Sequence, residues 1–169
     1  MSRSPTFKLA EPAPAETANW SGVPPLSMQQ LWFAIQRLEW ASLVIVPADG
    51  HSSAIDFGKP LYDVGNLAMG DRLRLLDARD VKLDKTAPLI LDMHGVARPQ
   101  ATVAQQRSER VLVMIESVLA APSAIPVALA ADAAILCVEL GKTSLAGARE
   151  TIQILGAQRF VGCTTLPPP

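Results

Sequence analysis

Ser42-Leu43-Val44-Ile45-Val46-Pro47-Ala48-Asp49-Gly50-His51-Ser52-Ser53 is the stretch on which the predicted fold rests. Its first part, Leu43 to Val46, is a short run of mostly β-branched apolar residues, which is typical of a strand buried on both faces. Pro47 cannot donate a hydrogen bond to a sheet ladder and should end the strand. Strands of this kind occur in parallel sheets covered by helices on both faces, so the stretch favours an α/β fold.

The turn after this strand has the frame of a phosphate-binding loop. Asp49 and Gly50 predict a tight turn, and Ser52 or Ser53 is expected to cap a following helix. A phosphate loop also needs several glycines and a Lys that reaches the terminal phosphate. Only Gly50 is present, and His51 stands in the place of the Lys. We therefore interpret Gly50, His51, Ser52 and Ser53 as a turn kept for folding; the alternative is a residual nucleotide site in which protonated His51 replaces Lys.

Length and composition exclude several classes of protein. The chain has 169 residues, of which 49% are apolar, and its formal net charge is −1. These values predict one globular domain and give no sign of a nucleic-acid-binding surface. Cys137 and Cys163 lie in apolar, strand-like runs without metal-ligand spacing, so we expect both to be buried, reduced thiols of a cytoplasmic protein. Neither a signal peptide nor a membrane-spanning run is predicted.

The chain divides into an arm, a domain and a tail. Residues 1–25 are rich in Pro and Ala and predict a flexible arm, residues 26–166 predict a single domain, and residues 167–169 are a Pro tail. Apolar runs and helical periods alternate through the domain, which predicts a mostly parallel sheet of about six strands with helices on both faces. The six predicted strands are Leu43–Val46, Leu73–Leu76, Leu89–Met93, Val111–Ile115, Ala133–Val138 and Arg159–Thr164.

Five helices are expected between or before these strands. Ser27 should cap a first helix of about a dozen residues, and a polar helix is expected from about Pro99 to Arg107. A short Ala-rich helix is expected near Ser123–Ala130, and Gly141-Lys142-Thr143-Ser144 should open a helix that stops at Gly156. The segment from Ala54 to Gly70 contains Gly58 and Pro60, so its helix is expected to be broken or delayed until Pro60.

The order of these landmarks resembles the cytoplasmic ATPase domain of bacterial capsule and exopolysaccharide tyrosine kinases. That family belongs to the ParA/MinD-like deviant Walker P-loop ATPases. The resemblance covers about residues 26–166 and is carried by Gly50-His51-Ser52, Leu75-Leu76-Asp77-Ala78-Arg79, Gly95 with Pro99, Val113-Met114-Ile115-Glu116-Ser117, Ala131-Asp132 with Gly141-Lys142-Thr143, and Val161-Gly162. It implies a P-loop NTPase-like fold.

The resemblance also implies where magnesium would bind. In the family, acids after the second strand and the Walker B strand serve the metal, and Asp77 and Glu116 occupy those places. However, Arg79 replaces the family's second acid, and Asp80 comes one residue late. We therefore expect these acids to be paired with Arg79, the alternative being a residual Mg²⁺ site. His51 and His94 are expected to follow neighbouring strands without forming a metal site.

Departures from the family pattern predict an inactive relative. The family's Tyr-rich tail is replaced by three prolines, Tyr62 is the only tyrosine, and neither ATP nor Mg²⁺ is expected as a cofactor. The resemblance implies a regulator or scaffold in bacterial exopolysaccharide biosynthesis or export. Such a protein would be cytoplasmic, held at the inner face of the membrane by a membrane-anchored polysaccharide co-polymerase-like partner or by self-association. The alternatives are an active ATPase or kinase with an altered Walker A loop, and a ParA/MinD-like positioning factor.

The first helix offers a candidate partner-binding surface. Met28, Leu31, Ile35 and Leu38 share one face, which we expect to cover the sheet. Phe33 and Trp40, seven residues apart, fall on the opposite face and are predicted to contact a second copy or a membrane-anchored partner. The alternative is that Trp40 turns into the core where the strand begins.

Overall fold

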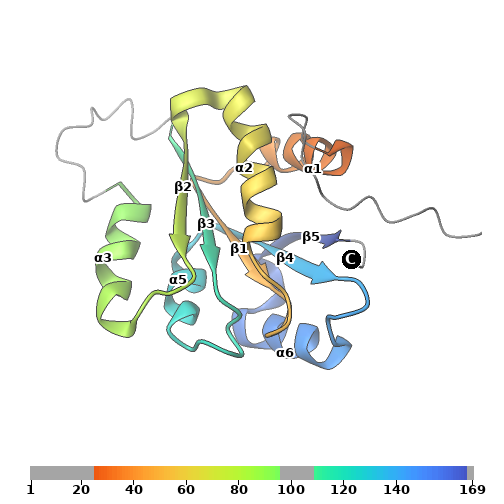
Figure 1. Ribbon diagram of the computed structural model, residues 1–169. Coiled ribbons are helices and arrows are strands. Elements are labelled where there is room, and N and C mark those ends of the chain that lie inside the picture. The colour runs from red at the N-terminus through yellow and green to blue at the C-terminus, as the bar shows by residue number, and fades with distance from the viewer. Residues whose placement is uncertain (1–24, 96–108, 167–169) are drawn as a thin grey trace, which may run out of the picture.

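Three apolar runs form the centre of a five-stranded sheet. The computed structural model describes residues 25–95 and 109–166. Within these ranges β1 (Ser42–Pro47) lies between β3 (Arg110–Ile115) and β4 (Ala133–Glu139). The edges are β2 (Leu73–Ala78) and β5 (Phe160–Leu166), so the strand order is β2-β3-β1-β4-β5 (Figure 1). Every pairing is parallel, and every residue of β1 is buried.

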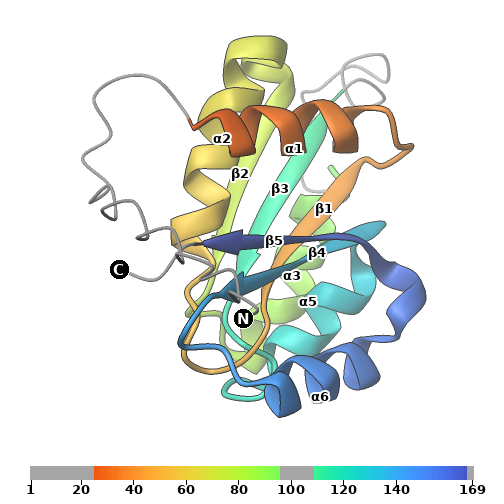
Figure 2. The same ribbon diagram turned by 90° about the vertical axis from the view of Figure 1, so that its right-hand side faces the viewer.

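The direction in which the chain crosses the sheet decides which face each helix covers. The connection from β1 to β2 runs toward one edge, whereas the later connections run back across β1 toward the other. Because crossovers between parallel strands are right-handed, opposite directions place their helices on opposite faces. The helices are α1 (Leu26–Gln36) and α2 (Ile55–Met69) on one face, and α3 (Leu83–Met93), α5 (Ala124–Ala130) and α6 (Leu145–Leu155) on the other (Figure 2).

Alternate residues of the central strands build two separate cores. Leu43 and Ile45 of β1 pack with Trp32 and Phe57 from α1 and α2, whereas the neighbouring Val44 and Val46 pack with α5 and Met93 of α3. Successive side chains of a strand point to opposite faces, so a strand at the centre of two cores must be apolar at every position. The predicted strands at Leu43–Val46, Val111–Ile115 and Ala133–Val138 are confirmed, as are the edge strands.

The predicted strand Leu89–Met93 is wrong, because these residues form the second half of α3. A strand would place Leu91 and Met93 on the same face, yet Leu91 is 50% exposed and Met93 is only 3% exposed. Thr86 is buried seven residues before Met93, which is the spacing of two helical turns. A short apolar run does not separate a buried strand from a half-buried helix. The sheet therefore has five strands rather than six.

The expected break in α2 is also wrong. The helix is continuous from Ile55 to Met69 with Pro60 inside it, and α3 likewise contains Pro88. Each proline is the sixth residue of its helix, so the carbonyl that loses its hydrogen bond belongs to the second residue, Asp56 or Asp84. Both of these aspartates are exposed, so water can donate to the freed carbonyls.

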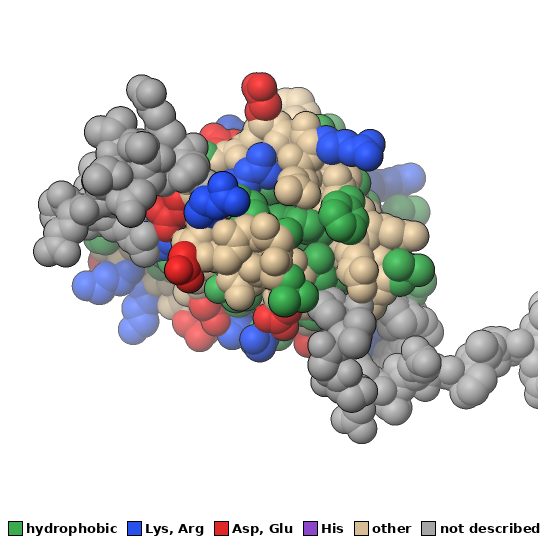
Figure 3. Space-filling view, turned by 90° about the horizontal axis from the view of Figure 1, so that it is seen from above, with side chains coloured by type: hydrophobic (Ala, Val, Ile, Leu, Met, Phe, Trp, Pro, Cys, Tyr) green, Lys and Arg blue, Asp and Glu red, His purple; other side chains and the backbone are tan. Residues whose placement is uncertain are grey.

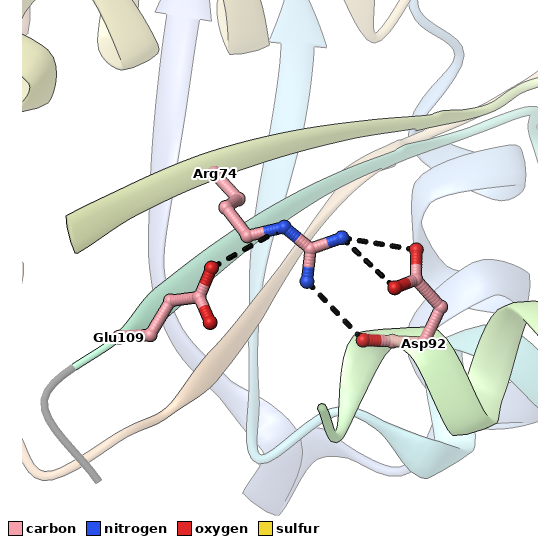
Figure 4. Close-up of polar contacts among 3 residues, drawn as sticks. All are labelled: Arg74, Asp92 and Glu109. Carbon is pink, nitrogen blue, oxygen red and sulfur yellow. Dashed lines mark hydrogen bonds and ion pairs between the residues drawn. The ribbon is translucent and has the colours of Figure 1, made fainter. Parts of the chain in front are cut away.

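An ion-pair cluster fixes α3 against edge strand β2. Arg74 of β2 donates to both carboxylate oxygens of Asp92 at 3.0 Å, and to the Asp92 carbonyl at 3.3 Å. Its Nε lies 3.4 Å from a carboxylate oxygen of Glu109 (Figure 4). The Arg74 side chain is only 14% exposed, so this two-sided pairing satisfies a guanidinium that packing would otherwise leave without water.

Helix ends follow the predictions in part. Ser144 caps α6 by accepting from the N–H of Gly147, and Gly156 ends that helix with a φ of 87°. Ser27 is not a cap, because α1 begins at Leu26. Ser52 and Ser53 do not cap α2, whose first residue is Ile55 and whose N-cap is Ala54. The predicted arm at residues 1–25, all but its last residue, the predicted helix from Pro99 to Arg107 and the Pro tail lie outside the described residues.

Candidate functional site

The strand order places a switch point at the carboxyl end of β1. The chain leaves β1 toward α2 on one face, whereas it leaves the neighbouring β3 and β4 toward α5 and α6 on the other. Open α/β sheets bind ligands in the crevice that such diverging connections leave. The loop of residues 48–54, which contains Gly50, His51, Ser52 and Ser53, starts at this point. The sequence-predicted loop is therefore at the position where the fold would hold a ligand.

Asp49 fills the polar centre of this loop. One carboxylate oxygen, Oδ1, accepts the backbone N–H of His51 at 3.0 Å and the hydroxyl of Ser52 at 3.4 Å. The other oxygen, Oδ2, accepts the backbone N–H of Ser144 at 2.6 Å. The Asp49 side chain belongs to a residue only 3% exposed, so these donors replace water around its charge. A carboxylate of the protein itself thus takes backbone N–H groups at the switch point.

The pKa of Asp49 reflects this arrangement. Burial alone would raise the pKa, but the N–H groups of Ser144 and His51 and the nearby imidazole of His51 together hold it below its ordinary value. The approach of the carboxylate also needs a glycine in the first turn of α6. A Cβ built on Gly147 would lie 2.7 Å from Cβ of Asp49 and 2.9 Å from Oγ of Ser144. The ionised carboxylate is therefore seated directly on the start of α6.

Hydroxyl groups extend this network across the β4–α6 turn. The hydroxyls of Ser52 and Thr143 lie 2.8 Å apart, and Thr143 Oγ1 accepts the N–H of Glu139. Thr151 of α6 donates to the carbonyl of Ala48 at 2.9 Å. The expected helix start at Gly141-Lys142-Thr143-Ser144 is confirmed, and its side chains tie the β1–α2 loop to α6. Gly50 and His51 themselves are exposed, and Ser53 is half-buried.

The acids predicted for a metal lie at the same edge of the sheet but are engaged elsewhere. Arg79 donates to both carboxylate oxygens of Asp77, from Nε at 2.8 Å and from Nη2 at 2.6 Å. These bonds hold the pKa of Asp77 below its ordinary value and raise the pKa of Arg79, to which the negative charges of Asp77, Asp80 and Glu116 also contribute. Glu116 accepts the N–H of Ser117 at 3.2 Å. Asp77 is thus paired directly with Arg79, and the charges of Asp80 and Glu116 act on the same guanidinium.

The two histidines lie at opposite ends of the parallel strands. His51 follows β1 at the carboxyl ends of the strands, whereas His94 follows α3, which returns the chain to their amino ends. The expectation that both histidines follow neighbouring strands is therefore wrong, because the run before His94 is a helix. No group of three or more His, Cys, Asp or Glu side chains in residues 25–95 and 109–166 is arranged to hold a metal ion.

Asp132 is a second carboxylate that accepts backbone N–H groups, and it lies at the amino ends of the strands. Its Oδ2 accepts the N–H groups of Ala41 and Ser42 at 2.9 and 2.8 Å and the Ser42 hydroxyl at 3.0 Å. Partial burial would raise the pKa of Asp132, but these N–H donors hold it below its ordinary value. In return, the N–H of Asp132 donates to Oγ of Ser42. Asp132 therefore fastens the start of β4 to the start of β1, which is a structural role.

The two aromatic residues predicted for partner binding are separated by the fold. Phe33 is 59% exposed, whereas Trp40 is only 6% exposed and belongs to the core. The indole N–H of Trp40 donates to the carbonyl of Ile35 at 2.8 Å, and its ring meets Trp32 edge-on at a centroid distance of 6.3 Å. Arg110 covers the Trp40 ring at 4.6 Å. The expectation that Trp40 faces outward is wrong. Helix α1 ends at Gln36, so Trp40 lies beyond the helix, where the chain turns toward β1.

The buried face of α1 is also shifted from the predicted one. Met28, Trp32 and Ile35 are buried, whereas Leu31 is partly buried and Leu38 is 40% exposed. The exposed side of α1 carries Leu26 and Phe33. Figure 3 shows the end of the molecule on which α1 lies, where hydrophobic side chains alternate with Lys, Arg, Asp and Glu. Among the described residues, the charged side chains at this end are of both signs and form no patch of one sign.

The two cysteines differ in exposure, although the sequence predicts the same environment for both. Cys137 of β4 is fully buried, and burial raises its pKa well above the ordinary value. Cys163 of β5 is exposed, so the expectation that both thiols are buried is wrong for Cys163. The reason is the strand order, since β5 is an edge strand and β4 is not. Both thiols are free rather than bonded in a disulfide.

Sequence reasoning missed the residues that hold the loop together. The sequence predicts for Asp49 only a place in a turn, whereas its carboxylate bonds to Ser144, 95 residues away, and lies against Gly147. The sequence Ser144-x-x-Gly147 indicates the start of α6, but it does not indicate that Asp49 packs against that start. Asp49 and the start of α6 come together because β1 and β4 pair side by side in the sheet.

Comparison with models of known protein families gives no match, and comparison with curated proteins gives none either. The fold and the switch point define the chain as an α/β protein with a five-stranded, all-parallel sheet. That architecture is compatible with P-loop NTPases but is shared by other classes of protein. Among the described residues, no helix combines the length and apolar character needed to span a bilayer.

Proposed function

We propose that the protein is a P-loop-like protein without nucleotide-dependent catalysis, which acts through protein–protein contacts. Its proposed setting is the biosynthesis or export of a bacterial exopolysaccharide, where it would be a regulator or scaffold. The observation that carries the first part is the seating of Asp49 in the loop after β1. The second part rests on the order of sequence landmarks described above, from Gly50 to Val161-Gly162.

The seating of Asp49 opposes phosphate binding in two ways. A phosphate loop binds its ligand with free backbone N–H groups, and here the N–H groups of His51 and Ser144 already donate to the carboxylate. Phosphate brought to the same place would also meet the negative charge of Asp49, which its low pKa preserves at neutral pH.

The acids at the ends of β2 and β3 support the same proposal. Asp77 gives both carboxylate oxygens to Arg79, which occupies the place of the second acid in the resembling family. A Mg²⁺ ion is normally held by one or two carboxylates together with substrate phosphates. Because Arg79 already occupies both carboxylate oxygens of Asp77, we expect this site to favour the guanidinium over Mg²⁺.

Thermal unfolding of the full chain tests the proposal. We expect the same midpoint with and without millimolar Mg-ATP, and also with MgCl₂ alone. A ligand present at a hundredfold its dissociation constant stabilises by about 2.7 kcal/mol, which corresponds to several degrees. A shift of that size with Mg-ATP would overturn the proposal and favour the altered ATPase. Absence of phosphate release and of phosphate on Tyr62 after incubation with labelled ATP is the second expected result.

The partner is proposed to be a membrane-anchored polysaccharide co-polymerase-like protein, which would hold this chain at the cytoplasmic face of the membrane. Phe33 is the exposed aromatic residue proposed to contact it. Co-purification with such a protein encoded beside this one tests the assignment, with Phe33→Ser as the variant and Gln30→Ser on the same helix as the matched control. Retention by Phe33→Ser at the level of the control would contradict the role of Phe33.

A further inference from the structure

The two edges of the sheet differ sharply in how they are protected. Edge strand β2 carries two charged residues, Arg74 and Asp77, and each forms an ion pair. Edge strand β5 reads Phe-Val-Gly-Cys-Thr-Thr-Leu over residues 160–166 and contains neither a charge nor a proline. Natural sheets protect an exposed edge with charged side chains, prolines, bulges or short strands, because an unprotected edge pairs with other strands. By this criterion β2 is protected and β5 is open.

Within residues 25–95 and 109–166, the backbone of β5 is paired along one side only. Its only partner in the described sheet is β4, and the strand borders the side of the molecule that faces the viewer in Figure 2. The carbonyl of Leu166 accepts the N–H of Leu140 at the end of β4. Because the backbone groups of successive strand residues point to opposite sides, those of Cys163 and Thr165 are directed away from β4.

The side chains of β5 alternate between half-buried and exposed positions along the strand. Phe160 and Leu166 pack partly into the cores, whereas Val161, Cys163 and Thr165 are exposed. The register irregularity of the β4–β5 pair lies at its first residues, next to Ala134 and Ile135. From Gly162 to Leu166 the strand is regular, so this segment can accept a further strand along its outer side.

We propose that β5 pairs with β5 of a second copy of this chain in an antiparallel, two-fold arrangement that joins the two sheets. A two-fold axis places the same segment opposite itself, so no partner of different chemistry is needed to complement it. Since residues 160–166 carry no charge, the arrangement brings no like charges together. The inference does not depend on the proposed absence of nucleotide binding.

The position of Cys163 makes the arrangement measurable. It is the middle residue of β5, so an axis through the middle of the strand sets it opposite Cys163 of the second copy. Directly opposed residues of antiparallel strands have Cα atoms about 4.5–5.5 Å apart, which lies within the range that a disulfide bridges. Cys137 is fully buried and provides an internal control for nonspecific oxidation.

Two measurements on the full chain test the proposal. We expect light scattering after size exclusion to give the mass of a dimer, and Thr165→Lys to give that of a monomer with an unchanged circular dichroism spectrum. Gln153→Lys, an exposed charge change on α6, should remain dimeric. Mild oxidation with copper phenanthroline, in which the oxidant accepts the two electrons released by two thiols, should give a covalent dimer in wild type and in Cys137→Ala but not in Cys163→Ser.

A monomer at all concentrations up to about 100 µM would overturn the proposal, as would a dimer that survives Thr165→Lys. A dimer lost in Phe33→Ser but kept in Thr165→Lys would assign self-association to α1 instead. If Thr165→Lys does not fold, the oxidation experiment decides by itself, because it needs no change in β5 other than Cys163→Ser. A dimer that gives no disulfide through Cys163 would exclude pairing centred on this residue.

Discussion

The backbone N–H of Ser144 donates to Oδ2 of Asp49 over 2.6 Å, across 95 residues of sequence. This bond joins the loop after β1 to the start of α6 on the opposite face of the sheet. The same carboxylate accepts the N–H of His51, so one buried charge contacts both the loop after β1 and the start of α6. Its neutralisation should therefore affect stability more than its position in a loop would indicate.

Asp49→Asn should lower the free energy of unfolding by about 1–3 kcal/mol. The amide keeps one acceptor oxygen but turns the other into a donor, which then faces the N–H of Ser144 or His51 in a buried site. Urea unfolding measures the change. Asp71→Asn, at an exposed position, is the matched control and should stay within about 0.5 kcal/mol of wild type. Equal effects at the two positions would contradict the role of Asp49.

Acid should destabilise the protein through Asp49 and Asp132. Their pKa values are lowered in the folded state, whereas an unfolded Asp titrates near about 3.9. Below that pH the unfolded chain takes up protons first, so stability is fully present above about pH 5 and falls as pH drops through the folded pKa values. Urea midpoints between pH 6 and 3 measure this slope. Asp49→Asn and Asp132→Asn should each make it shallower, and an unchanged slope in both would refute the linkage.

Gly147→Ala should destabilise, although Ala favours a helix more than Gly does. A Cβ at this position would lie 2.7 Å from Cβ of Asp49, so the loop or the helix must shift. Gly162→Ala is the comparison, because a Cβ there meets nothing within 4 Å. Thermal unfolding should show a loss for Gly147→Ala of roughly 1–3 kcal/mol and little change for Gly162→Ala. A gain of stability in Gly147→Ala would show that Asp49 is not tightly seated.

His51→Lys should not create nucleotide binding. The new ammonium would add the missing cation, but Asp49 would still hold the N–H groups of residue 51 and Ser144, and the loop would still have a single glycine. Isothermal titration with Mg-ATP is the measurement, and wild type is the reference. Affinity in the micromolar range for this single variant would mean that the loop is already shaped for phosphate, contrary to our proposal.

Trp40→Ala and Phe33→Ser should separate the core from the surface of α1. Trp40 is 6% exposed, contacts Trp32 edge-on and lies under Arg110, so its truncation should cost about 3–5 kcal/mol. Phe33 is 59% exposed, and Phe33→Ser should stay within about 0.5 kcal/mol of wild type. Denaturant unfolding of both variants measures the difference. Comparable losses would show that Phe33 is covered in solution.

Local pattern was sufficient where a segment has only one way to bury its residues. The runs at Leu43–Val46, Val111–Ile115 and Ala133–Val138 are apolar at nearly every position, which suits a central strand and no exposed element. Ser144 and Gly156 bracket α6 because a cap and a left-handed glycine act within a few residues. The α/β class and most element positions therefore followed from the sequence.

Tertiary structure decided what depends on neighbours distant in sequence. Leu89–Met93 is apolar enough for a strand, and only its packing in α3 shows that Leu91 is exposed while Met93 is buried. Trp40 is buried rather than exposed because the chain turns toward β1 after α1. Cys163 is exposed rather than buried because β5 lies at the edge of the sheet. Asp49 could be seen as a turn residue from the sequence, but its charge acquires partners only when β4 pairs beside β1 and brings Ser144 within hydrogen-bonding distance.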